Sequence, residues 1–376
     1  MKMCKGTVVY YGNLDLPDRS AAANRVSANA KILRCLGYKV VFIGVDKTSD
    51  YFEGVRVSDF DENTYLEAYP DTSKRWFLHI FDINNIKSVV SKYDDVKFIF
   101  LYNVPYETLK RVKKAYKKTS IKVVYDCTEW NSFAQGNFIK RYYKKYDAAK
   151  IEKNASKISD AMIVISKMMY NRYIKDSEKL LLLPPLVDLS DEMWNQSRKE
   201  HEGFEFCFAG SPGNKECMQE ILSAFDLLKH DKKRLRIIGL NEEEFVSLYP
   251  ESEKILSENE ERLDFMGYLS HKETVLYILS CDCYIFIRNS NKRNEAGFPT
   301  KFAEGFTCGV PIITTDVSDI KEYADSRCTV IDSVDVGLIS EAMKEKITDG
   351  VSDFSLKHDF SYENFISEFE KWFELI

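Results

Sequence analysis

The sequence predicts an α/β protein with two Rossmann-like, doubly wound domains, each holding a parallel sheet with helices on both faces. Three observations lead to this prediction. The chain has 376 residues, which suits two domains better than one. Short apolar segments alternate with segments of helical apolar spacing. This alternation pauses near residues 180–188 and then restarts, so we expect domains at 1–187 and 188–360 with a cleft between them.

The first domain is predicted from apolar strand-like segments that alternate with helical ones. A strand at 7–11 leads through a polar loop into a helix at 21–36, which Gly37 ends. Later strands are followed by basic helical segments. The remaining expected elements are strands at 38–44, 96–102, 121–125 and 161–165, and helices at 106–119 and 138–158.

Pro184 and Pro185 end the last strand of this domain and stiffen the exit from it. The alternation then resumes, and a final helix at 361–373 carries Phe365, Phe369, Trp372 and Phe373 on one stripe. A helix face with this many aromatic residues is expected to be buried against another part of the protein. The other expected elements are strands at 204–209, 234–239, 263–267, 283–287, 310–314 and 328–331, and helices at 216–228, 272–280, 300–308 and 336–347.

The composition, 44% hydrophobic and 30% charged, is ordinary for a globular protein and excludes several classes. The chain contains no apolar run of 18 residues, so no transmembrane helix is predicted. The first residues lack the apolar stretch of a signal peptide. Nine cysteines without paired CxxC spacing favour free thiols in a core, and five scattered histidines give no metal-ligand spacing. We therefore expect a cytoplasmic protein without a metal site.

The net charge of −6 is unevenly distributed along the chain. Residues 110–153 hold 13 basic and 4 acidic residues, a net charge of +9. Such a segment suits an anionic acceptor or the anionic inner face of the cell membrane, and solvated helix faces are an equally good explanation. The basic residues at four-residue spacing on the helix at 138–158 are Lys140, Arg141, Lys144 and Lys145.

The segment 294–311 is the strongest candidate for a binding site. It follows one apolar strand, precedes another, and contains a Gly/Pro loop that opens a helix at 300–308. Free backbone N–H groups and the positive dipole end make a helix N-terminus an anion site. Lys301 adds a cation there, and Glu304 lies three residues later. An anion site with a carboxylate beside it suits a nucleotide, with phosphates at the amides and ribose hydroxyls at the carboxylate.

This segment resembles the nucleotide-sugar motif of family-4 glycosyltransferases, which have the GT-B fold. The family pattern has a first Glu, which the register places at Ala296, and Glu295 lies one residue early. The positions that match in register are Gly297, Phe298, Glu304, Cys308, Gly309 and Pro311.

The resemblance implies a retaining hexosyltransferase that takes its sugar from a nucleoside diphosphate sugar and needs neither metal nor cofactor. The acceptor would be a glycan or a lipid-linked sugar of cell-surface polysaccharide or lipopolysaccharide biosynthesis, with no nucleic acid involved. Glu304 would bind the ribose, Glu295 would act near the sugar, and the last helix, 361–376, would return to the first domain. The loop residues that would face the sugar are Gly297, Phe298, Pro299 and Thr300.

A second candidate anion loop, 209–215, follows a strand and opens a helix. It resembles the family loop that holds the donor diphosphate with an Arg and a Lys. Lys215 matches the Lys and Ser211 stands in place of the Arg, so Arg288, at the end of another strand, is expected to supply that charge. A plain strand–helix turn, and a salt bridge at the rim for Arg288, remain as alternatives.

In the first domain, Gly12 follows the first strand, where the family's first loop touches the donor phosphates. Asp126 and Glu129 leave a later strand beside Trp130, so one carboxylate is expected to orient or deprotonate the acceptor hydroxyl. A helix-capping role for Asp126 is the alternative. Arg25 is expected either at the cleft or on the surface.

Two other functions remain open at this stage. The first is a nucleotide-sugar epimerase of the same fold, which would need acid and base groups around the sugar and would act without an acceptor. The second is a non-catalytic sugar-nucleotide-binding partner of another transferase, an alternative kept open by Ala296.

Overall fold

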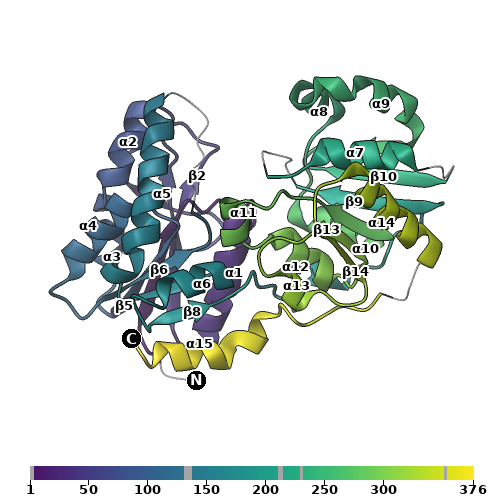
Figure 1. Cartoon of the computed structure of the whole chain (residues 1–376). Helices are drawn as coiled ribbons and strands as arrows, with labels where there is room; N and C mark the ends of the chain where they lie inside the picture. Colours follow the sequence, from purple (N-terminus) through teal and green to yellow (C-terminus); the bar gives the residue numbers. More distant parts are fainter. Residues whose placement is uncertain (1–3, 131–137, 211–214, 229–231, 351–353) are drawn as a thin grey trace. The chain divides into compact units, whose positions relative to one another are not determined.

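A computed structural model describes residues 4–130, 138–210, 215–228, 232–350 and 354–376. The chain forms two compact units (Figure 1). Unit 1 comprises Met1–Leu186 and Ser361–Ile376, and unit 2 comprises Val187–Phe360. Each unit contains one sheet flanked by helices, so the predicted α/β class with two doubly wound sheets is confirmed.

The sheet of unit 1 has eight strands in the order β3-β4-β2-β1-β5-β6-β7-β8, and every described pairing except that of β3 with β4 is parallel. The strand order reverses beside β1, which pairs with both β2 and β5. In doubly wound sheets, ligands bind outside the carboxyl ends of the strands at such a reversal. The strands are β1 Thr7–Gly12, β2 Lys39–Asp46, β3 Val55–Val57, β4 Thr64–Ala68, β5 Val96–Tyr102, β6 Lys122–Cys127, β7 Ala161–Val164 and β8 Leu180–Leu182.

Local sequence explains the main helix of unit 1. The side chain of Ser20 accepts a hydrogen bond from the Ala23 N–H and caps the start of α1, and Gly37, with a φ of 94°, follows its end. The helices of this unit are α1 Ala21–Cys35, α2 Ser73–Phe81, α3 Asn84–Val90, α4 Tyr106–Tyr116, α5 Phe138–Ile158, α6 Lys167–Tyr173 and α15 Ile366–Phe373.

The segment between residues 46 and 95, to which the sequence pattern assigned no element, contains β3, β4, α2 and α3. The apolar pattern is weak because β3 has only three residues and β4 buries a carboxylate, Glu67. On α2 only Ile80 is buried, while Phe77 and Leu78 are exposed, so the apolar residues of this short helix do not indicate which face is buried. Helices and strands whose apolar pattern is this weak are not recognised from the sequence pattern alone.

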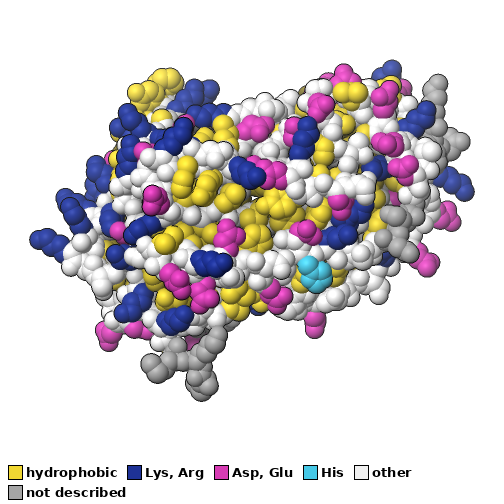
Figure 2. Space-filling model, turned by 60° about the horizontal axis from the view of Figure 1, so that its bottom comes forward, with side chains coloured by type: hydrophobic (Ala, Val, Ile, Leu, Met, Phe, Trp, Pro, Cys, Tyr) yellow, Lys and Arg dark blue, Asp and Glu magenta, His cyan; other side chains and the backbone are white. Residues whose placement is uncertain are grey.

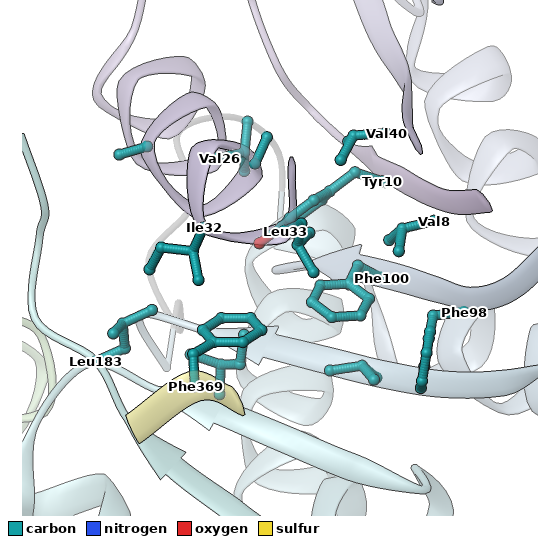
Figure 3. Close-up of a cluster of buried hydrophobic side chains, with 14 of the residues drawn as sticks. Val8, Tyr10, Val26, Ile32, Leu33, Val40, Phe98, Phe100, Leu183 and Phe369 are labelled. Carbon is teal, nitrogen blue, oxygen red and sulfur yellow. The ribbon is translucent and has the colours of Figure 1, made fainter. Parts of the chain in front are cut away.

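The aromatic stripe of α15 packs into the core of unit 1 (Figure 3). Phe369 is fully buried among side chains of β1, β5 and α1, and the ring of Phe373 lies 4.6 Å, centroid to centroid, from that of Phe98. Figure 1 shows this helix beside α1 and β8. Unit 1 therefore takes its core from two segments that are separated by the whole of unit 2.

The sheet of unit 2 has six parallel strands in the order β11-β10-β9-β12-β13-β14, and its order reverses beside β9. Its strands are β9 Phe204–Ala209, β10 Lys233–Ile238, β11 Leu263–Phe265, β12 Cys283–Phe286, β13 Ile312–Thr315 and β14 Cys328–Ile331. Its helices are α7 Met218–Leu227, α8 Glu242–Leu248, α9 Glu253–Glu258, α10 His271–Ser280, α11 Lys292–Ala296, α12 Thr300–Thr307, α13 Ile320–Tyr323 and α14 Val336–Asp349.

Replacing Phe369 by Ala tests the contribution of α15 to unit 1. The change removes a fully buried ring, so we expect a loss of about 3–5 kcal/mol in the free energy of unfolding. Hydrogen exchange at the amides of β1 and β5, followed by mass spectrometry, reports on unit 1 alone. Leu375→Ala, at a position that is 57% exposed, is the matched control and should cost less than about 0.5 kcal/mol. Equal protection in the two variants would contradict the packing role.

Candidate functional site in unit 2

Two of the predicted diphosphate-binding cations, Arg288 and Lys301, meet at one carboxylate that the sequence analysis did not single out. The Oε1 atom of Glu216 accepts from Arg288 Nη2 at 2.6 Å, from Arg288 Nε at 3.0 Å and from Lys301 Nζ at 2.9 Å. The Glu216 side chain is 3% exposed, against 13% for Arg288 and 14% for Lys301. The cations thus converge on a single anionic oxygen, the geometry that a phosphate oxygen requires.

Lys301 is held in place by its surroundings as well as by its charge. It lies in the first turn of α12, and its Nζ lies 4.4 Å from the centroid of the Phe208 ring. A Cβ atom at Gly210 would lie 2.6 Å from Lys301 Cε. Gly210 also has a φ of 121°, which side-chain-bearing residues rarely adopt. The glycine that follows β9 is therefore required both by the backbone turn and by the lysine beside it.

Burial and charge act in opposite directions on these groups. Burial alone would raise the pKa of Glu216, but Lys301 and Arg288 outweigh it, so the pKa lies below the usual value and the carboxylate stays ionised. Burial lowers the pKa of Lys301, and Glu216 only partly offsets this. The rim salt bridge considered for Arg288 is thus an interior ion pair.

The predicted ribose ligand, Glu304, has a fixed partner. Its Oε1 lies 3.0 Å from Nε2 of His271, the first residue of α10, and both side chains are 15% exposed. Glu304 lies one helical turn after Lys301 on α12, as the sequence spacing indicated. The motif analysis did not include His271, because this residue follows a segment outside the loops that the analysis considered.

The loop expected before α12 contains the short helix α11, and Glu295 lies within it. Glu295 Oε1 accepts from the Ser290 hydroxyl at 2.7 Å, and its Oε2 accepts from the Ser318 N–H at 2.9 Å. The hydroxyl of Ser318 donates to the Gly297 carbonyl. Glu295 therefore joins two loops.

The neighbouring residues of the motif are placed mainly by packing. Ala296 is fully buried, so a longer side chain in that register would enter the interior. Phe298 is 6% exposed and packs against Phe302, Tyr323 and Phe360, so its ring belongs to the core of unit 2. Gly297 has an ordinary extended backbone, with φ −83° and ψ −179°. Pro299 is buried and caps α12 without a side-chain hydrogen bond, and Thr300 is half-buried.

The second anion loop is described only in part. Ser211 lies outside the described residues. Lys215 is half-buried and directly precedes Glu216, at the carboxyl end of the sheet where α12 also begins. The charge of Glu216 was visible in the sequence, but its partners are 72 and 85 residues away along the chain. Only the folded structure brings them together.

In unit 1, Asp126 lies in a buried network. Its carboxylate is fully buried, its Oδ1 accepts from Arg25 Nη2 at 3.1 Å, and its Oδ2 accepts from Asn29 at 3.2 Å and from the Tyr10 hydroxyl. Arg25 also donates to the carbonyl oxygens of Leu183 and Pro184 at 3.0 and 3.1 Å. Arg25 is thus buried within unit 1 and not on the surface, and Asp126 caps no helix.

Gly12 and Glu129, the other two predicted site residues of unit 1, lie outside this network. Gly12 ends β1, and a Cβ atom there would lie 2.9 Å from the Tyr102 carbonyl oxygen, so close packing of β1 against β5 requires the glycine. Glu129 is half-buried two residues after β6. Its catalytic role stays a prediction.

Within the described residues, no cluster of three or more His, Cys, Asp or Glu side chains is arranged to hold a metal ion. None of the described helices is both long enough and apolar enough to cross a bilayer.

The sequence of unit 2 matches a known family. Residues 190–365 match the model described as Glycosyl transferases group 1. This segment, less than half of the chain, contains Glu216, Arg288, Lys301 and Glu304. A comparison with curated proteins gives no significant match.

Solved structures of glycosyltransferases share the fold of the whole chain. A sucrose-phosphate synthase from Thermosynechococcus elongatus has a TM-score of 0.69 at 12% identity, over 98% of each chain. The Anabaena protein Alr3699/HepE, solved with UDP and glucose, has a TM-score of 0.69 at 10% identity, over 99% of this chain and 100% of that one. An alpha,alpha-trehalose-phosphate synthase (UDP-forming) from Burkholderia xenovorans, solved with glucose-6-phosphate, has a TM-score of 0.68 at 10% identity, over 98% and 99%. At such identities the likeness establishes the fold, which is that of the GT-B glycosyltransferases.

Asp126→Asn separates a structural role of this carboxylate from a catalytic one. The variant leaves Arg25 buried without a counter-charge, so we expect the free energy of unfolding to fall by about 3–5 kcal/mol. Urea unfolding followed by circular dichroism measures the loss. Asp18→Asn, at an exposed position, is the control and should change stability by less than about 0.5 kcal/mol. If the Asp126→Asn protein were as stable as the parent, the network would not contribute to the free energy of unfolding.

Proposed function

We propose that the protein is a retaining glycosyltransferase that moves a hexose from a nucleoside diphosphate sugar to an acceptor hydroxyl. The observation that carries the proposal is the convergence of Arg288 and Lys301 on Glu216, within the segment that matches group 1 glycosyltransferases. Three solved structures of Alr3699/HepE, which has the same fold, contain UDP, with glucose, alone or as UDP-glucose. UDP-sugars are therefore the first donors to test.

In the proposed complex, the cations of unit 2 stabilise the charge that develops on the leaving diphosphate. Lys215, Arg288, Lys301 and the first amides of α12 supply this stabilisation, so no metal ion is needed. Glu304, oriented by His271, accepts hydrogen bonds from the ribose hydroxyls. Glu216 sets the net charge of the pair of cations near +1, which favours release of the nucleotide product over permanent binding.

Unit 1 is proposed to bind the acceptor, a glycan or lipid-linked sugar of cell-surface polysaccharide or lipopolysaccharide assembly. Its α5 presents Phe138, Ile139 and Tyr142, each at least 67% exposed, beside Arg141 and Lys145. Figure 2 shows dark-blue basic side chains gathered on the side of unit 1 that carries α4 and α5. Exposed aromatic groups among cations suit the headgroup region of an anionic membrane.

Two of the cations on α5 also have partners within the protein. The Nζ atoms of Lys140 and Lys144 lie 5.3 and 5.7 Å from the centroid of the Trp76 ring on α2. The membrane interaction of this face is therefore proposed to depend more on Arg141 and Lys145, which are exposed, than on the two lysines.

The activity is tested by thermal shift and by donor turnover. Binding to the native state raises the melting temperature, so UDP and the correct UDP-sugar should each raise it. Nucleotide release from that sugar, with and without glycoside acceptors, then measures transfer. Epimerised donor without transfer would favour the epimerase, and binding without any turnover would favour the non-catalytic partner.

Glu304→Ala and Glu295→Ala separate the two carboxylates of the motif. Glu304→Ala should weaken binding of UDP itself by about one to two decades, because a charge-assisted contact with the ribose is worth roughly 1.5–3 kcal/mol. Glu295→Ala should leave UDP affinity unchanged and loosen the loops at Ser290 and Ser318, because each of these residues donates a hydrogen bond to one Glu295 oxygen. Calorimetric titration with UDP and with the intact donor gives both affinities. The reverse order of effects would place Glu295 at the nucleotide.

Charge reversal of α5 tests the membrane surface. In a variant with Glu at 140, 141, 144 and 145, binding to anionic phospholipid vesicles should fall by at least a decade, since each cation near the surface contributes about 1 kcal/mol. Vesicle sedimentation at increasing salt measures the binding. The matched control reverses four exposed lysines of unit 2, namely Lys232, Lys254, Lys272 and Lys344. Equal loss in both variants would indicate a dependence on net charge alone.

A further inference from the structure

One oxygen of the Glu216 carboxylate has no hydrogen-bond partner in the part of the chain that the structure describes. Oε1 accepts all three hydrogen bonds from Arg288 and Lys301. Oε2 is buried and accepts none. The side chain as a whole is 3% exposed, so bulk water does not replace the missing donor. Buried polar atoms without a partner are uncommon in folded proteins, and each one calls for an explanation.

Two other buried carboxylates show the usual pattern, in which both oxygens are satisfied. Each oxygen of Asp126 accepts at least one hydrogen bond. Glu67 on β4, which is 2% exposed, accepts from the Tyr11 hydroxyl at 3.0 Å through Oε1 and from the Asn85 amide at 2.8 Å through Oε2. Glu216 departs from this pattern although it lies among charged donors.

Among the described residues, Glu205 is the other carboxylate with a buried oxygen that has no partner. It is the second residue of β9, at the amino end of the sheet, whereas ligands of doubly wound sheets bind at the carboxyl end. Burial raises the pKa of Glu205, which favours its neutral form. Burial acts on Glu216 as well, but Lys301 and Arg288 hold its pKa below the usual value. The unpartnered oxygen of Glu216 therefore belongs to an ionised group.

The Glu216 carboxylate also lies at the ligand end of its sheet. Glu216 follows β9 and Arg288 follows β12, the neighbouring strand. The N–H group of Cys217 donates to the Ile287 carbonyl at 2.9 Å and holds the two segments together. The strand order reverses beside β9, and ligands of such sheets bind beyond the strands at the reversal.

The missing partner must be a hydrogen-bond donor, because an ionised carboxylate only accepts. The diphosphate of a nucleotide sugar cannot supply it, since its oxygens are acceptors too. The ribose hydroxyls are donors, but their proposed ligand is Glu304, whose partner is His271. The remaining donors close to the diphosphate are the hydroxyls of the transferred sugar.

We propose that Glu216 determines which donor sugar is accepted, and that its Oε2 accepts a hydrogen bond from a hydroxyl of that sugar. The inference rests on the proposed glycosyl transfer and concerns unit 2 alone. Oε1 holds Arg288 and Lys301 at the diphosphate, while Oε2 is left for the sugar attached to it. One carboxylate thus connects recognition of the diphosphate with recognition of the sugar.

The same inference explains how the site functions with an alanine at position 296. The methyl group of Ala296 is buried and cannot bind a hydroxyl, and both oxygens of Glu295 accept from Ser290 and Ser318. Residues 295 and 296 therefore offer the sugar no carboxylate oxygen, and Glu216 offers one from a different loop. A sugar that lacks the hydroxyl would leave an ionised oxygen buried without a donor, so the site would discriminate against it.

The parent protein is tested first, by calorimetric titration of the full-length chain. The ligands are UDP, UDP-glucose, UDP-galactose and the monodeoxy analogues of both sugars. At one position, loss of the hydroxyl should weaken binding by about one to two decades, the contribution of a hydrogen bond to a charged group. Equal affinity for the complete sugars and for every analogue would overturn the assignment, without the need for any variant.

Glu216→Gln identifies the group that binds this hydroxyl. The variant keeps an oxygen for Arg288 and Lys301, so UDP should bind at least as tightly as to the parent. The penalty for the missing hydroxyl should fall to less than about fivefold, because a hydrogen bond between neutral groups is weaker. The matched control, Glu220→Gln, makes the same change of charge in the first turn of α7 and should keep the penalty of the parent.

The remaining outcomes separate this inference from the proposed function. If Glu216→Gln has the parent's melting temperature and the same penalty, another group binds the hydroxyl and the assignment is overturned. An equal loss of affinity for UDP and for the complete sugar would overturn it as well, because Glu216 would then act only by placing the cations. A parent protein that binds neither UDP nor any of these sugars would instead reject the proposed function itself.

Discussion

The buried ion pair of Arg25 and Asp126 is the interaction on which the arrangement of unit 1 depends. It joins α1 to β6, and through the carbonyl oxygens of Leu183 and Pro184 it also holds the segment that leaves the unit. A charge buried this deeply is tolerated only when an opposite charge and hydrogen bonds compensate for the lost water. Tyr10 and Asn29 supply the remaining hydrogen bonds to the carboxylate. The exit from unit 1 is therefore fixed by electrostatics as much as by the two prolines.

Unit 2 also contains a buried carboxylate that is paired with cations, but there the pairing holds the cations of the candidate site. There, too, a buried carboxylate has cationic partners, but Glu216 has two of them, and their hydrogen bonds to it all end on one oxygen. The cations are consequently held in position before any ligand arrives. Preorganised charge of this kind loses little free energy to rearrangement when an anion binds. Asp126 thus links α1 to β6 in unit 1, whereas Glu216 holds two cations in position in unit 2.

Local pattern was sufficient to predict the α/β class, most strands of both sheets, and the helix that carries Lys301 and Glu304, because these depend on apolar periodicity and on Gly and Pro positions. The sequence pattern did not predict interactions between residues that lie far apart along the chain. Arg25 and Asp126 are 101 residues apart, so nothing near Asp126 indicated that its carboxylate is buried. The segment that contains Glu67 and His79 was missed for a related reason: a buried charge interrupts the alternation that identifies a strand.

The return of α15 to unit 1 has a consequence for the order in which the protein is made. The ribosome completes Val187–Phe360 before it makes the segment that contributes Phe369 and Trp372 to the core of unit 1. Unit 2, continuous in the chain, has all of its residues at that moment, whereas the sheet of unit 1 still exposes the surface that α15 covers. Domains generally fold as units during synthesis. We therefore expect unit 1, although its first strand emerges earliest, to be the last to reach its native core and the part most dependent on chaperones in the cell.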